Sequence, residues 1–128
     1  MKTLFEQELG QLVYDGGWKR AEPLNVHDCN LLVVFQAFES EDVSAEQKEL
    51  YAFALKNMYT LLVNAQEKVI QELGAESLED IAITTVYFNR TNSFGFLCDY
   101  AADFEHGMAI KFNGQTIEPE IGQMDILI

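Results

Sequence analysis

The chain has 128 residues, of which 48% are hydrophobic and 12% aromatic. That is enough for a single domain, 1–128, with a buried core, and it excludes a disordered chain. Eight Lys and Arg stand against 21 Asp and Glu, a formal net charge of −13. A surface of this sign repels phosphates and anionic lipid, so we expect no nucleic-acid or membrane partner, but it attracts a basic protein.

The N-terminal region carries Glu6 and Glu8 where a signal peptide would be apolar, and no apolar run reaches the length of a membrane span. We therefore expect a cytoplasmic protein. The two cysteines, Cys29 and Cys98, are too few for a disulfide framework, and their positions within apolar sequence indicate reduced, buried thiols. A catalytic Cys–His pair is the alternative, but no spacing supports it.

The first third of the sequence predicts strands. Residues 12–14 are apolar, Asp-Gly-Gly follows at 15–17, and Trp18 opens the next strand; such turn residues are typical of a tight hairpin. Residues 31–38 form an apolar run rich in β-branched and aromatic residues, which favours a strand covered on at least one face.

Residues 44–73 predict the strongest element, a helix. Ser44 and Gln47 have the spacing of a capping box, and Gly74 is a typical helix stop. The expected buried stripe is spaced by threes and fours and consists of Tyr51, Leu55, Met58, Leu62, Ala65 and Val69. About thirty residues would span roughly 45 Å, which exceeds a compact domain of this size, so the helix must overhang the sheet or break between Asn57 and Asn64.

The rest of the chain returns to strands. Residues 81–88, 94–98 and 108–112 have the expected composition or alternation, Asn113-Gly114 predicts a hairpin into 115–117, and 125–128 predicts a last short strand. The fold class that we expect is α+β, with a mostly antiparallel sheet and one long helix, continuous or broken, packed across one face.

One short segment concentrates chemistry-bearing side chains. Asp99, Asp103, Glu105 and His106 fall within eight residues, and oxygen and imidazole ligands suit several divalent ions. Their spacing matches no metal-ligand motif, and in an extended chain Glu105 and His106 would point to opposite faces. We therefore predict a structural segment with no metal, no cofactor and no catalytic residue, in which Asp caps a turn and His106 donates a hydrogen bond.

The same segment carries a resemblance that extends along the chain. The residues concerned are Gly95-Phe96-Leu97-Cys98, then Asp103-x-Glu105-His106-Gly107-x-Ala109-Ile110, then Gly122-x-x-Asp125-Ile126. This pattern resembles a family of small bacterial domains of unknown function with a Cys-x-Trp-Asp-x-Glu-His-Gly type of signature, although Ala102 stands in the Trp position and the Cys-to-Asp spacing is longer by two. The resemblance implies an immunity-type protein of a bacterial toxin system, which acts by blocking rather than by catalysis, or a solitary relative of such proteins.

Three functions therefore follow as expectations. The leading one is a protein-binding module, a monomer or weak homodimer, that blocks a basic toxin or binds another basic partner. Its candidate binding residues are Asp99, Asp103, Glu105, His106 and Phe53, the last because it projects to the polar side of the helix. The alternatives are a small metal-dependent or acid/base enzyme built on 99–106, and an oligomerising structural domain that uses the helix stripe.

Overall fold

The computed structural model describes residues 2–128, and nine strands of this part form one sheet. In chain order the strands are β1 (Thr3–Glu6), β2 (Gly10–Tyr14), β3 (Trp18–Arg20), β4 (Leu24–Val26), β5 (Cys29–Phe35), β6 (Ile81–Phe88), β7 (Ser93–Tyr100), β8 (Met108–Asn113) and β9 (Glu120–Gly122). The spatial order is β1-β2-β3-β5-β6-β7-β8-β9, and β4 pairs with the first half of β5. The β5–β6 pair is parallel and the other pairs are antiparallel.

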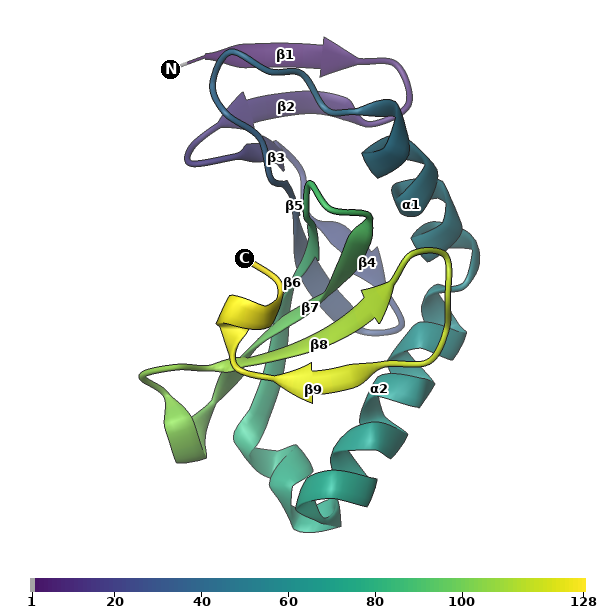
Figure 1. Cartoon of the computed structure of the whole chain (residues 1–128), viewed down its shortest axis with the longest axis vertical. Helices are drawn as coiled ribbons and strands as arrows, with labels where there is room; N and C mark the ends of the chain where they lie inside the picture. Colours follow the sequence, from purple (N-terminus) through teal and green to yellow (C-terminus); the bar gives the residue numbers. More distant parts are fainter. Residues whose placement is uncertain (1) are drawn as a thin grey trace.

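Two α-helices and a 3₁₀ turn connect the parallel strands, as a crossover between parallel strands requires. They are α1 (Ala45–Lys56), α2 (Met58–Leu73) and η1 (Ala75–Asp80); two further turns are η2 (Ala101–Asp103) and η3 (Met124–Ile126). Figure 1 shows α1 and α2 one after the other along one side of the sheet. Within residues 2–128, no helix has the length and apolarity to cross a membrane.

The prediction of one long helix across one face is wrong, because the segment forms two shorter helices. The break lies at Asn57, at the start of the stretch where a break was the expected alternative. They are separated at Asn57, whose φ of −111° and ψ of 15° leave the helical region. The Asn57 side chain donates to the carbonyl oxygen of Phe53 at 2.9 Å, and the Asn57 backbone N–H donates to the same oxygen at 3.1 Å. An amide that competes for helix carbonyls in this way favours a helix end.

The buried helix face also differs from the predicted stripe. Tyr51, Met58, Leu62, Ala65 and Val69 are buried, but Leu55 is 41% exposed. Leu50, Ala54 and Leu61 complete the buried face instead. Because this stripe packs into the domain's own core, it is not a free surface for oligomerisation.

A row of four phenylalanine rings forms the centre of the core. Phe35, Phe88, Phe94 and Phe112 are direct neighbours on β5, β6, β7 and β8. Consecutive rings are stacked with centroids 5.1, 5.6 and 5.2 Å apart, and all four side chains are fully buried. Tyr51 of α1 meets the rings of Phe35 and Phe88 edge-on, so α1 is held on the sheet through this row.

The local signals at the first hairpin and at the helix termini are confirmed. The turn between β2 and β3 has positive φ at Gly16 and Gly17, and Tyr14 pairs with Trp18. Ser44 and Gln47 form both hydrogen bonds of the capping box, and α2 ends at Gly74 with a φ of +93°.

Two predictions near the C-terminus are wrong. Residues 115–117 are not a strand: β9 starts at Glu120, and the N–H of Gly114 donates to the carbonyl of Asn92 in the β6–β7 turn at 2.8 Å. The Asn-Gly pair therefore begins a longer loop rather than a two-residue hairpin. Residues 125–128 do not add a strand, because η3 occupies this region and buries Leu127.

Candidate functional site

The β6–β7 pair extends beyond both of its neighbours at one end. β5 pairs with β6 from Thr85 to Phe88, and β8 pairs with β7 up to Cys98. The pairs Ala82–Asp99 and Ile81–Tyr100 lie past these limits. This end of the ribbon, together with the loop 101–107 that leaves it, forms the candidate site.

A hydrogen-bonded turn holds the shape of that loop. The Nδ1–H of His106 donates to Oδ1 of Asp103 at 2.9 Å, and the backbone N–H of Gly107 donates to the Asp103 carbonyl at 2.8 Å. Gly107 has a φ of +63°, and a Cβ there would lie 2.5 Å from Cε of Met124. The positive φ favours glycine at this position, and any larger residue would also have to displace the end of the Met124 side chain.

The same turn changes the acidity of Asp103. The hydrogen bond from His106 lowers the pKa of the Asp103 carboxyl from its ordinary value of 3.8, since it stabilises the charged form. Asp103 is therefore a carboxylate at neutral pH, and its hydrogen-bond donor within the chain is His106.

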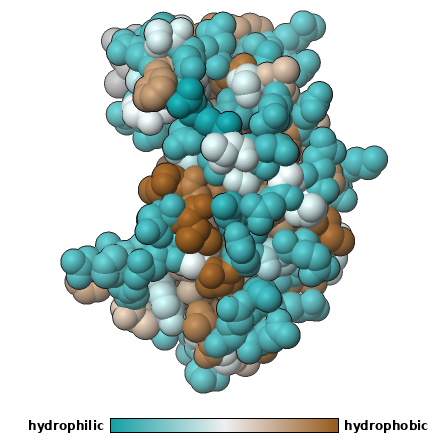
Figure 2. Space-filling view, in the orientation of Figure 1, coloured by the Kyte–Doolittle hydropathy of each residue, from teal (hydrophilic) through white to brown (hydrophobic). Residues whose placement is uncertain are grey.

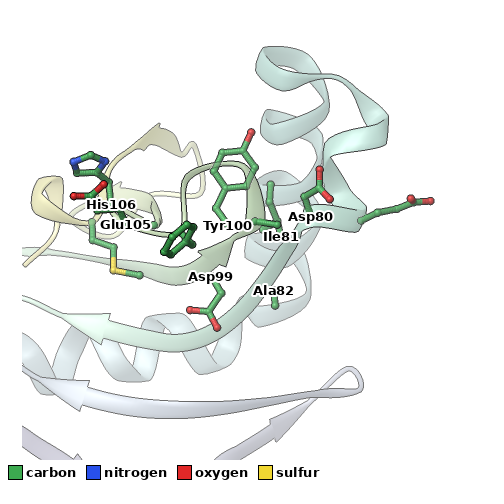
Figure 3. A pocket seen from close by; sticks show the side chains of 12 residues that line it. Asp80, Ile81, Ala82, Asp99, Tyr100, Glu105 and His106 are labelled. Atoms are coloured by element: carbon green, nitrogen blue, oxygen red, sulfur yellow. The ribbon is translucent and has the colours of Figure 1, made fainter.

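A cleft of about 430 Å³ opens between the ribbon end and the loop (Figure 3). Its lining comes from η1, β6, β7, the loop and η3: Glu79, Asp80, Ile81, Ala82, Asp99, Tyr100, Ala101, Phe104, Glu105, His106, Gly107 and Met124. In Figure 3, Asp99 and Ala82 point to one side of the ribbon, whereas Tyr100 and Asp80 point to the other. The cleft thus wraps around the end of β7, and its acids present a charged rim rather than a converging cage.

Three of the five predicted binding residues line this cleft, namely Asp99, Glu105 and His106. Asp103 does not line it but braces the loop through His106. Phe53 lies elsewhere: its side chain is half-buried and its ring meets Phe94 edge-on, with centroids 6.2 Å apart. The expectation of an exposed Phe53 is therefore wrong, because the side chain packs at the border of the core.

The sequence reasoning missed the residues that complete the cleft. Glu79 and Asp80 are separated from Glu105 by about a fifth of the chain, and the pairing of Ile81 with Tyr100 brings them into the same cleft. Phe104, which lies inside the predicted segment but was not singled out, is 89% exposed. An aromatic residue flanked by acids in a loop was the available signal for Phe104; no local signal points to Glu79 or Asp80.

Two possible sources of catalysis are a metal site and a cysteine nucleophile. Among residues 2–128, no three His, Cys, Asp or Glu side chains are grouped closely enough to hold a metal ion. Burial raises the pKa of the Cys98 thiol to about 12, so at neutral pH it is a protonated core side chain and not a nucleophile. What the cleft offers chemically is carboxylate oxygens and aromatic surface, which suit a cationic ligand.

Comparisons with protein-family models, with curated proteins and with solved structures give no match to this chain. The resemblance to an immunity-type family stays a prediction from the residues that carry it.

Proposed function

We propose that this protein is a protein-binding module that takes a basic partner at the cleft of the β6–β7 end. The observation that carries the proposal is the charge of the cleft, which is lined by Glu79, Asp80, Asp99 and Glu105 and, within the described chain, by no Lys or Arg. Lysine or arginine side chains of a partner would supply the missing positive charge, arginine with two-pronged hydrogen bonds to a carboxylate.

Most of the protein's own cations pair with acids outside the cleft, and none of the eight Lys and Arg lines it. Five of the eight Lys and Arg form ion pairs with acidic side chains: Lys19, Lys48, Lys68, Arg90 and Lys111. None of these pairs includes an acid of the cleft. Since the net charge is −13, the field of the whole chain adds to the attraction at the rim.

Phe104 supports a protein partner rather than a small cation. Its ring is 89% exposed beside the carboxylates, and an aromatic side chain next to charged groups is typical of an interface centre. A blocking role of the immunity type, as the resemblance implies, is one form of such binding, because it needs a complementary surface and no chemistry.

The test is kinetic. The partner is first captured from the native host and identified, and its association is then followed by surface plasmon resonance as the salt concentration rises. Association should slow markedly, because the Debye length falls from about 30 Å at 0.01 M to about 8 Å at 0.15 M salt. Dissociation should change less, since it depends on the buried centre of the contact.

A matched pair of variants locates the effect. The triple substitution Asp80→Asn, Asp99→Asn and Glu105→Gln should slow association more than Glu8→Gln, Glu22→Gln and Glu118→Gln. The two triples remove the same charge, but the second removes exposed acids outside the cleft. Equal effects, or an association rate that ignores salt, would contradict the proposal.

A further inference from the structure

The sheet ends on one side at β1, whose outer edge pairs with no other strand of residues 2–128. The N–H of Tyr14 donates to the carbonyl of Lys2 at 2.9 Å, and Lys2 continues the antiparallel register of β1 with β2. Hydrogen-bonded and non-bonded pairs alternate along such a ladder. Because Lys2 turns its backbone groups toward β2, the N–H and C=O groups of Thr3 and Phe5 point away from β2 to the outer edge.

This outer edge of β1 is exposed. Thr3 is exposed and the Phe5 side chain is 70% exposed. The segment that follows β5 crosses the helix-bearing face of the sheet, where Trp18 donates through its Nε1–H to the carbonyl of Glu41 at 2.6 Å. In Figure 1, β1 is the outermost strand at its end of the sheet. The edge therefore offers free backbone groups to an added strand.

The other unpaired edges carry protection that β1 lacks. Pro119, which has no N–H to donate, directly precedes the short strand β9. The start of β6, where β5 does not pair, directly follows Glu79 and Asp80. Proline and charged side chains are typical protections of an edge. The one acid of β1, Glu6, already accepts from Lys48 at 3.0 Å, so part of its charge is offset.

The residues at this edge are complementary to themselves. A second copy that pairs antiparallel about Leu4 places Thr3 opposite Phe5 at two positions, and these residues carry the outward backbone groups, which gives about four hydrogen bonds. The same pairing places Lys2 opposite Glu6 at both ends of the contact, and opposite charges at directly facing positions are favourable. The neighbouring register, centred on Phe5, would instead set Glu6 against the apolar side chain of Leu4.

The net charge limits the strength of such a contact. Two copies that each carry −13 repel one another at long range. Figure 2 shows the strongest hydrophobic colour near the middle of the face in view, whereas the end formed by β1 is mostly hydrophilic. A small contact built on backbone hydrogen bonds is weak. Salt should strengthen it, because salt screens the long-range repulsion more than the contacts between facing residues.

We infer that a second copy of this chain binds at the outer edge of β1, so that the two sheets continue into one across a two-fold axis at Leu4. The inference does not rest on the proposed function, since no residue of β1 lines the cleft. Salt separates the two interactions, because it slows association with a basic partner but strengthens self-association.

Sedimentation equilibrium of the full chain at up to about 1 mM protein measures the dimer. The dimer fraction should rise from low salt to about 0.5 M salt. Lys2→Glu sets like charges against each other at both ends and should weaken the dimer about tenfold. Lys56→Glu, at an exposed position on α1, makes the same change in net charge and should weaken it much less. Lys2→Glu combined with Glu6→Lys restores both the facing charges and the net charge, and should recover the dimer.

Amide hydrogen exchange tests the backbone contact. At protein concentrations that populate the dimer, exchange at Thr3 and Phe5 should slow, whereas exchange in β9 should not change. Thr3→Pro removes one outward donor from each copy and no donor of the β1–β2 ladder, so it should weaken the dimer. Urea denaturation of each variant at low protein concentration checks that the fold is kept.

Several outcomes would overturn the inference. These are a chain that stays monomeric at about 1 mM protein, equal losses in Lys2→Glu and Lys56→Glu, and no recovery in the double variant. A dimer that weakens as salt rises, that survives Thr3→Pro unchanged, or that protects β9 in place of Thr3 and Phe5 would also overturn it. The proposed function fails separately, on the salt series with the basic partner and the cleft variants.

Discussion

The two ends of the β6–β7 pair differ although the same two strands form both. At the Phe88–Phe94 end, β5 and β8 flank the pair on both sides and α1 covers it, so the four stacked rings are fully buried. At the Ile81–Tyr100 end, neither β5 nor β8 pairs with the ribbon, and an exposed aromatic ring and four acids surround a cleft. The closed end holds the centre of the core, whereas the open end leaves charged and aromatic side chains exposed to solvent.

Polar side chains reinforce the same contrast. The Asn89 side chain accepts from the N–H groups of Thr91 and Ser93 at 2.9 and 3.1 Å, which closes the β6–β7 turn. Gln47, 3% exposed, donates to the carbonyls of Gln36 and Phe88 at 2.8 and 3.1 Å. At the open end the corresponding polar contact, Asp103 with His106, is exposed. Buried polar contacts are expensive to break, whereas exposed ones are not.

The largest expected effect is at the Phe row. Phe88→Ala removes a ring stacked on two others in a filled core and should lower the free energy of unfolding by about 3–5 kcal/mol. Urea denaturation followed by the fluorescence of buried Trp18 measures it. Phe5→Ala, which truncates a ring that is 70% exposed, is the control and should change little; similar losses in both variants would mean that the row is not the centre of the core.

The next effect is at Gln47. Gln47→Ala removes the side-chain donor to the carbonyls of Gln36 and Phe88, of which the Phe88 carbonyl keeps the N–H of Gln36, and it removes one half of the capping box. It should therefore cost about 1–3 kcal/mol. Glu49→Ala, two positions along α1 and exposed, is the matched control. If the two variants denature at the same urea concentration, the bridge from α1 to the β6–β7 turn contributes nothing.

The sequence predicted the features that depend only on residues close together in the chain. Ser44 and Gln47 satisfy each other across one helical turn, and the glycines at 16 and 17 adopt backbone angles that few other residues tolerate, so both features follow from short-range chemistry. The same is true of the Asp103–His106 turn, where the expected hydrogen bond is present.

Long-range pairing decided the rest. Strand alternation places Phe88 and Phe94 on strands, but the stacking of four rings depends on the register of four strands together, which no local pattern contains. The Asn57 side chain donates to the carbonyl of Phe53 and so favours the end of α1. The helix breaks there although the helical spacing of hydrophobic residues continues past Asn57. Asn113-Gly114 has the residues of a hairpin, but the N–H of Gly114 donates to the carbonyl of Asn92 in the neighbouring β6–β7 turn. This tertiary contact outweighs the local preference for a two-residue turn.

A smaller effect is expected at the brace of the open loop. Because the Asp103 pKa is lowered in the folded state, the pair stabilises the fold at pH values above the ordinary value of 3.8, and this contribution is lost as the pH falls through the lower folded value. His106→Ala should therefore raise the pKa of Asp103, measured by NMR titration of its carboxyl carbon. The stability difference between parent and variant should close below about pH 4. An unchanged titration midpoint would mean that the hydrogen bond is absent in solution.

The smallest expected effect on stability is at Phe104, and it is the sharpest test of the separation between the two ends. The ring is 89% exposed, so the folded state buries little of it and gains little from it. Phe104→Ser should leave the free energy of unfolding within about 0.5 kcal/mol of the parent value, as is usual for surface substitutions. The same variant should weaken binding of the proposed basic partner, because an exposed aromatic ring beside carboxylates would be buried in such a complex. Amide exchange across 101–107 checks that the loop keeps its shape, since Asp103, His106 and Gly107 hold it without the ring. A loss of more than about 1 kcal/mol would show that Phe104 packs on the ribbon in solution, and the open end would then be part of the folded core rather than a surface left for a partner.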